Sequence, residues 1–136
     1  MPYNFMNKLL LLFALFLFSC TKADFTTGID CTVYFGKGDC MPVFNNATEN
    51  YKKYNGRIYL VNKEAADSLG KPGFTLLKLK STSLNIRNGR LSVELPAGIF
   101  LVMPEDYYIN TTSNTVTIAE KQIYDKDVKI WICTSY

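Results

Sequence analysis

The feature that most constrains the fold is an alternation of apolar and polar residues with a period of two. Leu91, Val93 and Leu95 alternate with Ser92 and Glu94. Successive side chains of a strand point to opposite faces, so this pattern predicts a half-buried β-strand rather than a helix. Further strands are expected at residues 29–35, 57–62, 74–80, 84–86, 99–103, 115–118 and 128–132.

Residues typical of turns separate these segments. Asn55-Gly56 precedes one strand, and Arg87-Asn88-Gly89 is typical of a hairpin whose glycine has a positive φ. We expect Gly36 and Gly38 to end the first strand, and residues 64–69 to form the one helical turn. Roughly seven or eight short strands separated by such turns favour an all-β, Greek-key sandwich. The side chains around the turn at 96–98 that we expect in the core are Leu91, Val93, Leu95, Phe100 and Val102.

A separate apolar run lies near the start of the chain. Residues 9–18, LLLLFALFLF, follow Lys8. As a helix this run covers only about 15 Å, roughly half of the hydrocarbon core of a bilayer. That length is typical of the apolar part of a signal peptide. We therefore expect residues 1–19 to be a cleaved signal peptide. The residues that end the run indicate its type, and the alternatives to that type are an ordinary secretory signal or a buried apolar helix.

The end of this run, Leu17-Phe18-Ser19-Cys20, resembles the lipobox of bacterial lipoproteins. In a lipobox the peptide is cut before the cysteine, whose thiol then carries lipid. The resemblance implies lipidation of Cys20, a lipidated tether at residues 20–28 and a sandwich domain at 29–136. It also implies an outer membrane lipoprotein that faces the periplasm or the cell surface. Lys22 and Asp24 partly resemble the signal that directs some Bacteroidetes lipoproteins to the surface.

Residues 88–102, NGRLSVELPAGIFLV, resemble the G-x-Φ-x-Φ-x-L-P-x-G-x-Y-x-V core of carboxypeptidase regulatory-like domains. Segments 38–42 and 131–133 look like parts of small Bacteroidetes lipoproteins with the same domain. The resemblance implies a prealbumin-like (transthyretin-like) sandwich with a non-catalytic role. One branch of that fold hydrolyses 5-hydroxyisourate with histidines and a Y-R-G-S ending. This chain has no histidine and ends in CTSY, so it does not fit that branch.

Composition narrows the possible functions further. Without histidine the chain lacks the commonest general base, the commonest partner of a nucleophilic serine or cysteine, and the commonest metal ligand. There are 15 lysine and arginine residues against 12 acidic ones, a net charge of +3 that does not favour a nucleic-acid partner. We therefore expect a protein that is not an enzyme and that uses no cofactor and no metal.

Three cysteines remain if Cys20 carries lipid, which allows one disulfide and one free thiol. The spacing of Cys31 and Cys40 does not suit a zinc site. In a Greek-key sandwich the first strand can lie parallel to the last, which would bring Cys40 beside Cys133. We predict that disulfide. If the two strands were antiparallel, Cys31 would be the nearer partner of Cys133, and the fate of Cys31 stays open.

Several tyrosines fall in apparent loops. Tyr51, Tyr54, Tyr107 and Tyr108 could form a contact surface for a glycan or a protein. The alternative is that they cap the ends of the sandwich, with rings inside and hydroxyls outside. The sequence thus favours a non-enzymatic, lipid-anchored cell-envelope protein that presents its sandwich as a structural or interaction module. The alternative is a small-ligand or glycan-binding lipoprotein that uses Tyr54, Tyr107 and Tyr108. No individual ligand follows from the sequence.

Overall fold

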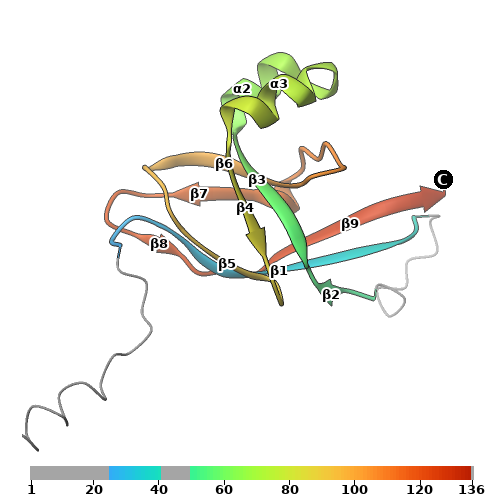
Figure 1. The fold of residues 1–136 in the computed structure, drawn as a ribbon, viewed down its shortest axis with the longest axis horizontal. Coiled ribbons are helices and arrows are strands. Elements are labelled where there is room, and N and C mark those ends of the chain that lie inside the picture. Colours follow the sequence, from blue (N-terminus) through green and yellow to red (C-terminus); the bar gives the residue numbers. More distant parts are fainter. Residues whose placement is uncertain (1–24, 41–49, 136) are drawn as a thin grey trace, which may run out of the picture.

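The computed structural model describes residues 25–40 and 50–135, which form two β-sheets and a pair of short helices (Figure 1). This arrangement confirms the all-β sandwich; the expected signal peptide, residues 1–19, lies outside the described residues. The helices are α2 (Lys63–Leu69) and α3 (Phe74–Lys80), with 3-10 turns at Lys71–Gly73 and Thr112–Asn114. The strands are β1 (Gly28–Asp39), β2 (Lys52–Lys53), β3 (Gly56–Asn62), β4 (Thr82–Ile86), β5 (Arg90–Glu94), β6 (Gly98–Pro104), β7 (Thr115–Ile118), β8 (Ile123–Tyr124) and β9 (Val128–Ser135).

The first sheet is built around β1, the longest strand. β5 and β2 pair antiparallel with successive stretches of β1, at residues 28–32 and 34–35. β8 and β9 pair parallel with β1, at residues 28–29 and 33–39. The first strand therefore lies parallel to the last, as the disulfide prediction required. The expectation that Gly36 and Gly38 end this strand is wrong, because pairing with β9 continues to Asp39.

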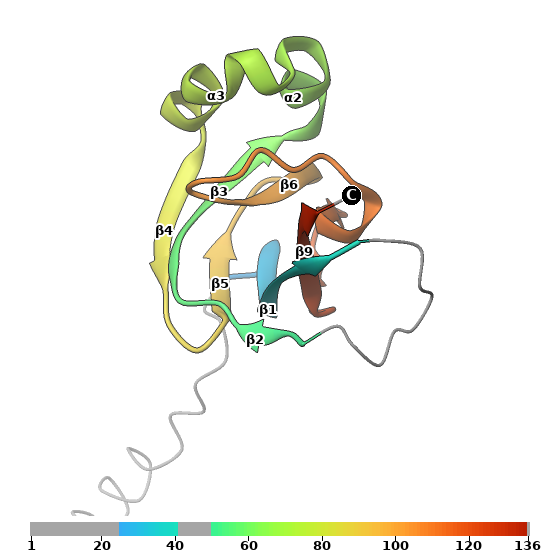
Figure 2. The same cartoon turned by 90° about the vertical axis from the view of Figure 1, so that its right-hand side faces the viewer.

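The second sheet has the order β4-β3-β6-β7, and all its pairs are antiparallel. Its central strand β6 is buried on both sides. Val102 faces the core between the two sheets, whereas Leu101 and Met103 pack beneath the helices. Figure 2 shows α2 and α3 lying across the end of this sheet. This double burial explains the nearly unbroken apolar run of residues 99–103, because both faces of the strand need apolar side chains.

The core between the sheets is made by inward-facing residues of nearly every long strand. The expected core positions Leu91, Leu95 and Val102 are buried, whereas Val93 and Phe100 are only partly so. Phe100 lies near the start of β6, where the neighbouring Ile99 is exposed. The buried core residues are Ile29, Cys31, Val33, Ile58, Leu60, Ile86, Leu91, Leu95, Val102, Val116, Ile118, Val128 and Ile130.

The expected strand at residues 74–80 is wrong, because this segment is helix α3. Leu77 of α3 is buried in a cluster with Leu101 and Met103 of β6. Phe74, three residues before Leu77, packs against this cluster. Leu76 and Leu79 point away from that cluster and are exposed. Leucine and lysine are good helix formers, and a spacing of three places side chains on one helical face. The expected helical turn at 64–69 is confirmed as α2, whose first turn is capped by Asn62 accepting a hydrogen bond from the Ala65 amide at 3.1 Å.

The predicted turn at residues 87–89 is present, but the expectation that it closes a hairpin is wrong, because β4 pairs with β3 and β5 pairs with β1, in different sheets. Asn88 and Gly89 have φ values of 52° and 71°. These are the positive values that a two-residue hairpin turn requires. A Cβ at Gly89 would also lie 2.6 Å from the Val33 carbonyl oxygen. Gly89 therefore provides both the turn from one sheet to the other and its close approach to β1.

Candidate functional site

The candidate site lies where β1, β2 and β9 run side by side, at the end of the first sheet that carries the C-terminus (Figure 1). A hollow of about 550 Å³ opens at this end. Three of its eight lining residues are lysines and none is acidic, so its local charge is positive. The lining residues are Phe35, Gly36, Lys37, Asn50, Lys52, Lys53, Tyr54 and Asn55.

Trp131 lies next to this hollow on the outer face of the sheet. Its neighbours Ile130 and Val128 alternate with it and face the core, so the indole points outward. A Cβ at Gly36 would come within 2.5 Å of the Trp131 ring, and a Cβ at Gly38 within 2.4 Å. No side chain tolerates such a distance. The two glycines therefore allow the indole to lie directly on β1 while its other side stays partly exposed.

Tyr51 continues this aromatic surface. Its ring meets Trp131 edge to face, with 5.4 Å between centroids and 65° between planes. The Lys129 ammonium lies 5.7 Å from the Tyr51 centroid. The carbonyl oxygen of Asn50 would be 3.0 Å from a Cβ at Gly36, so the segment before β2 passes directly over that glycine. The same bare backbone therefore accommodates both aromatic residues.

Tyr34 faces the same side of the sheet, one strand position before Gly36 on that face. It pairs with Lys53 of β2 on one edge and with Lys129 of β9 on the other. Both lysines are exposed. We call Tyr34, Tyr51, Trp131, Lys53 and Lys129 the aromatic–lysine face. Lysines gathered at one end of a module attract anions, and this attraction weakens as salt increases.

A second aromatic cluster lies on the inner side of β1 at the same end. The Phe35 ring contacts Tyr54 at 5.6 Å and Tyr107 at 5.8 Å between centroids. The Lys37 ammonium lies 4.8 Å from the Tyr107 centroid. The structure thus brings together two of the three tyrosines predicted as a contact surface, on either side of Phe35.

The Tyr54 hydroxyl is hydrogen-bonded within the domain. It donates a hydrogen bond of 3.0 Å to the Arg57 carbonyl oxygen. Burial is the main cause of the raised pKa of Tyr54, and the negative charges of Asp106 and Glu105 add to it. Tyr54 is therefore a neutral, anchored side chain at neutral pH, and its ring is the part that borders the hollow.

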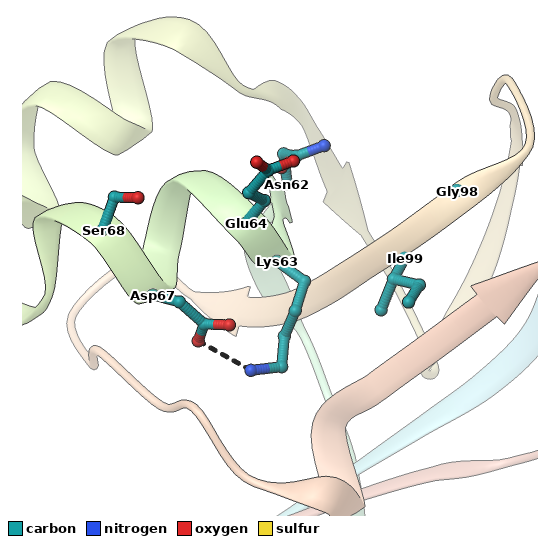
Figure 3. A pocket seen from close by; sticks show the side chains of 7 residues that line it. All are labelled: Asn62, Lys63, Glu64, Asp67, Ser68, Gly98 and Ile99. Atoms are coloured by element: carbon teal, nitrogen blue, oxygen red, sulfur yellow. Dashed lines mark hydrogen bonds and ion pairs between the residues drawn. The ribbon is translucent and has the colours of Figure 1, made fainter.

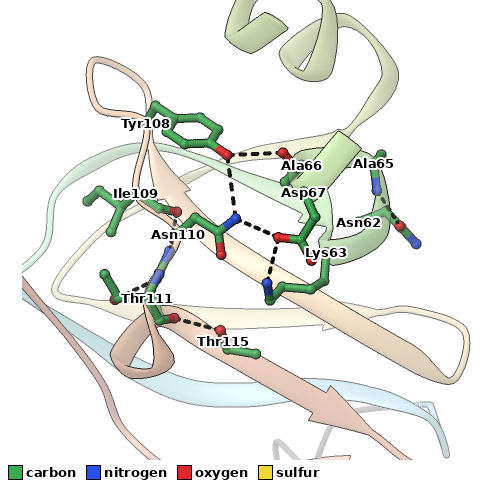
Figure 4. Close-up of polar contacts among 11 residues, drawn as sticks. Asn62, Lys63, Ala65, Ala66, Asp67, Tyr108, Ile109, Asn110, Thr111 and Thr115 are labelled. Carbon is green, nitrogen blue, oxygen red and sulfur yellow. Dashed lines mark hydrogen bonds and ion pairs between the residues drawn. The ribbon is translucent and has the colours of Figure 1, made fainter. Parts of the chain in front are cut away.

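The third predicted tyrosine, Tyr108, lies elsewhere, beside the helices. Its hydroxyl donates to the Ala66 carbonyl oxygen at 3.1 Å, and its ring meets Phe74 edge to face at 5.8 Å. The neighbouring Asn110 amide donates to the Asp67 carboxylate at 2.7 Å (Figure 4). These bonds attach α2 to the loop between β6 and β7. Tyr108 therefore lies apart from the Phe35 cluster.

A further polar hollow, of about 570 Å³, lies between α2 and the start of β6. Figure 3 shows Lys63 and Asp67 pointing toward one another there, and their ammonium and carboxylate are 2.6 Å apart. The Lys63 hydrogen bond is the main cause of the lowered pKa of Asp67, and the Asn110 hydrogen bond contributes. A carboxylate held ionised in this way is poorly suited to act as a general acid. Its contacts instead fix the position of α2.

The predicted disulfide is confirmed, and the structure settles the state of Cys31, which the sequence left open. Cys40 and Cys133 form a disulfide with 5.3 Å between their Cα atoms, which joins the end of β1 to β9 beside the aromatic–lysine face. Cys31 is a free, buried thiol. Burial raises its pKa to about 12, and the negative charge of Asp127 adds to the effect. At neutral pH the Cys31 thiol is therefore protonated and shielded from solvent.

Among residues 25–40 and 50–135, no three His, Cys, Asp or Glu side chains are grouped so that they could hold a metal ion. None of the helices in that part of the chain is both long and apolar enough to span a bilayer. Cys20, the predicted lipidation site, lies outside the described residues. Comparison with known proteins gives no matching family model, no matching curated protein and no matching solved structure.

Sequence reasoning missed Trp131 and the lysines around it. Two signals could have found them. Gly36 and Gly38 lie two residues apart inside a strand, which is typical of a close approach by another group. Trp131 occupies the polar phase of the last strand, alternating with Ile130 and Ile132. An aromatic residue in that phase points away from the core.

Proposed function

We propose that this protein is a non-enzymatic, lipid-anchored cell-envelope protein whose carboxypeptidase regulatory-like sandwich serves as an interaction module. The observation that carries the proposal is the position of the aromatic–lysine face. The chain enters the domain at the start of β1, and this face lies around the other end of that strand. A strand of 12 residues separates the two ends by about 36 Å. A lipid at Cys20 and a tether at 20–28 would thus present the face away from the membrane.

The character of the face supports binding rather than catalysis. It combines partly exposed rings with flexible ammonium groups, which suits contact with a partner. Two groups that could otherwise do acid–base or nucleophilic chemistry have structural roles: Asp67 is paired with Lys63, and the Cys31 thiol is buried. We therefore assign the protein a recognition role at the distal end of its sandwich.

A small-ligand or glycan-binding lipoprotein is the second candidate. The hollow of about 550 Å³ beside Tyr54 favours it, because its volume is in the range of pockets that hold small molecules. The contact surface in that case is centred on Tyr54 and Tyr107, which both contact Phe35, since Tyr108 belongs to the helix side of the molecule. The two candidates share the anchor and this end of the sandwich, and they differ in the size of the partner.

The anchor is tested with Cys20→Ser. Cells that express the wild-type chain or the variant are grown with an alkyne-labelled fatty acid and then fractionated. We expect wild-type protein in the membrane fraction with the label attached. The variant should carry no label and should leave that fraction, because acyl chains on Cys20 provide the binding energy. A variant that stays in the membrane with unchanged mass would contradict the lipoprotein assignment.

The interaction is tested by photo-crosslinking in intact cells. A photoreactive phenylalanine analogue replaces Lys129 in the aromatic–lysine face or, as the control, the exposed Thr117 of the other sheet. We expect a discrete adduct at position 129 that is weak or absent at 117. Equal adducts at both positions, or none at 129, would remove the support for a recognition role at this end.

A further inference from the structure

We infer that the aromatic–lysine face binds an acidic polysaccharide, with a sugar ring stacked on Trp131 and carboxylate or sulfate groups paired with the surrounding lysines. This inference rests on the proposed function and names the chemical class of its partner. It follows from three features: the support beneath Trp131, the sign of the charge around it, and the kind of cation that supplies this charge.

The first feature is the way Trp131 is held. Gly36 and Gly38 support the ring from below, so no side chain of β1 lifts or tilts it. Tyr51 meets the ring edge to face, with 65° between the two planes, and the indole stays partly exposed. The negative face of an aromatic ring attracts the slightly positive C–H groups of a flat ligand. A sugar ring presents such C–H groups on one face and hydroxyls around its rim.

The second feature is the charge. Lys53 and Lys129 lie on the face itself, whereas Lys37 and Lys52, which share the phase of Phe35, add positive charge at its edge, where they line the hollow with Lys53. All four side chains are exposed, and no acidic residue lines the hollow. The acidic residues Asp106 and Glu105 affect Tyr54 from the inner side of β1. The complementary ligand is therefore negatively charged.

The third feature is the choice of lysine. Protein–protein interfaces are enriched in arginine and depleted of lysine, because the rigid guanidinium fork loses less freedom when it binds. None of the residues lining the hollow is an arginine. Lysine supplies a mobile point charge that can follow a ligand with repeating charges. This favours a charged polymer of sugars over an acidic protein surface.

The spacing of the lysines fits a chain that crosses the sheet. Lys53, Tyr34 and Lys129 occupy three neighbouring strands at paired positions. Two strand spacings place the backbone positions of the two lysines about 10 Å apart. An extended acidic polysaccharide lying across β2, β1 and β9 could therefore pair two of its charged groups while an intervening or adjacent ring meets the aromatic residues.

The test uses the single tryptophan of the chain as its reporter. Purified lipidated protein in detergent is titrated with polygalacturonate and with chondroitin sulfate, and the emission of Trp131 is recorded. Neutral dextran, poly-L-glutamate and vesicles of anionic phospholipid are titrated in parallel. We expect a saturable change in emission with one or both acidic polysaccharides, weakened by salt, and a much smaller response to the other three.

Two matched variants locate the binding. Lys52→Gln, Lys53→Gln and Lys129→Gln together remove two charges from the face and one from its edge. Lys71→Gln, Lys80→Gln and Lys126→Gln remove the same charge from exposed positions elsewhere. We expect the first triple variant to bind about tenfold more weakly, from three exposed ion pairs, and the second to stay within about twofold of wild type.

Several results would overturn the inference. They are no binding of either acidic polysaccharide, an equal loss in both triple variants, or a saturable polysaccharide isotherm without any change in Trp131 emission. A stronger response to poly-L-glutamate would identify an acidic polypeptide as the partner, and a stronger response to vesicles a lipid surface. If the crosslink at position 129 persists in any of these cases, the proposed function stands and only its polysaccharide partner is wrong.

Discussion

The outer faces of the two sheets differ in what covers them. On the β3–β6 sheet, helices α2 and α3 bury Leu77, Leu101 and Met103 in a second core. On the β1–β9 pair, Trp131 lies on Gly36 and Gly38 and stays partly exposed. A large apolar side chain is stabilised when at least one of its sides is packed. The backbone at Gly36 and Gly38 packs against one side of Trp131, and no helix is needed to cover the other side. The first sheet therefore keeps an aromatic surface partly exposed, whereas the second uses its apolar residues for packing.

The largest expected effect comes from removing the Cys40–Cys133 disulfide, which joins β1 to β9 beside the aromatic–lysine face. Cys40→Ser with Cys133→Ser opens a disulfide between residues 93 positions apart. The chain-entropy model gives a loss of about 4–5 kcal/mol in the free energy of unfolding. Urea unfolding followed by circular dichroism measures it. Reductant should lower the free energy of unfolding of the wild-type protein to that of the variant and should not change that of the variant. A variant as stable as wild type would show that the disulfide does not stabilise this end of the sheet.

The covered face is tested by two leucines of one helix. Leu77 is 1% exposed and Leu79 is 79% exposed, so they report the two sides of α3. Leu77→Ala should lower the free energy of unfolding by about 3 kcal/mol, the usual cost of a buried leucine deletion. Leu79→Ala should change it by less than about 0.5 kcal/mol. Equal effects in thermal or urea unfolding would mean that α3 does not cover this sheet as described.

The glycine support is tested by Gly38→Ala. The new methyl group would lie 2.4 Å from the Trp131 ring, so the indole must move. We expect a loss of about 1–3 kcal/mol in the free energy of unfolding, the usual cost of overpacking. Trp131 should also show red-shifted emission and stronger quenching by iodide. Lys37→Ala, at the exposed position between the two glycines, is the control and should leave the emission unchanged. Unaltered emission in Gly38→Ala would show that the ring does not rest on this strand.

The smallest effect at neutral pH concerns Cys31, on the inward side of β1. Native protein should react very slowly with a thiol reagent at pH 8, and unfolded protein should react fully. The pKa of Cys31 is about 12 in the fold and 9.0 ordinarily. Its contribution to stability is therefore complete below pH 9 and is lost as pH rises toward 12. Cys31→Ala should remove that part of the alkaline decline; rapid labelling of native protein would contradict the burial.

The sequence predicted best those features that depend on neighbouring residues. The alternation around Leu91 predicted a strand and Asn88-Gly89 a tight turn, and both are present. The turn joins the two sheets instead of closing the predicted hairpin, because β5 pairs with β1 and β4 with β3. The segment 74–80 was misread because FTLLKLK has apolar residues at both strand and helix spacings. Only its contact with Leu101 and Met103 of β6 decided between them. The disulfide lay within reach of sequence reasoning because one topological rule linked Cys40 to Cys133.

The candidate site depends on contacts that the sequence alone does not predict. The sequence by itself determined the strand around Leu91 and the outward phase of Trp131, because both follow from local periodicity. The pairing of Cys40 with Cys133 also needed the parallel direction of β1 and β9, which the structure supplies. Only the tertiary structure decided that Trp131 lies on Gly36 and Gly38, and that Tyr51 and Lys129 lie beside it. The indole and the glycines are 93 or more residues apart in the chain. Their contact depends on the register between β1 and β9, which is set by the packing of the whole core.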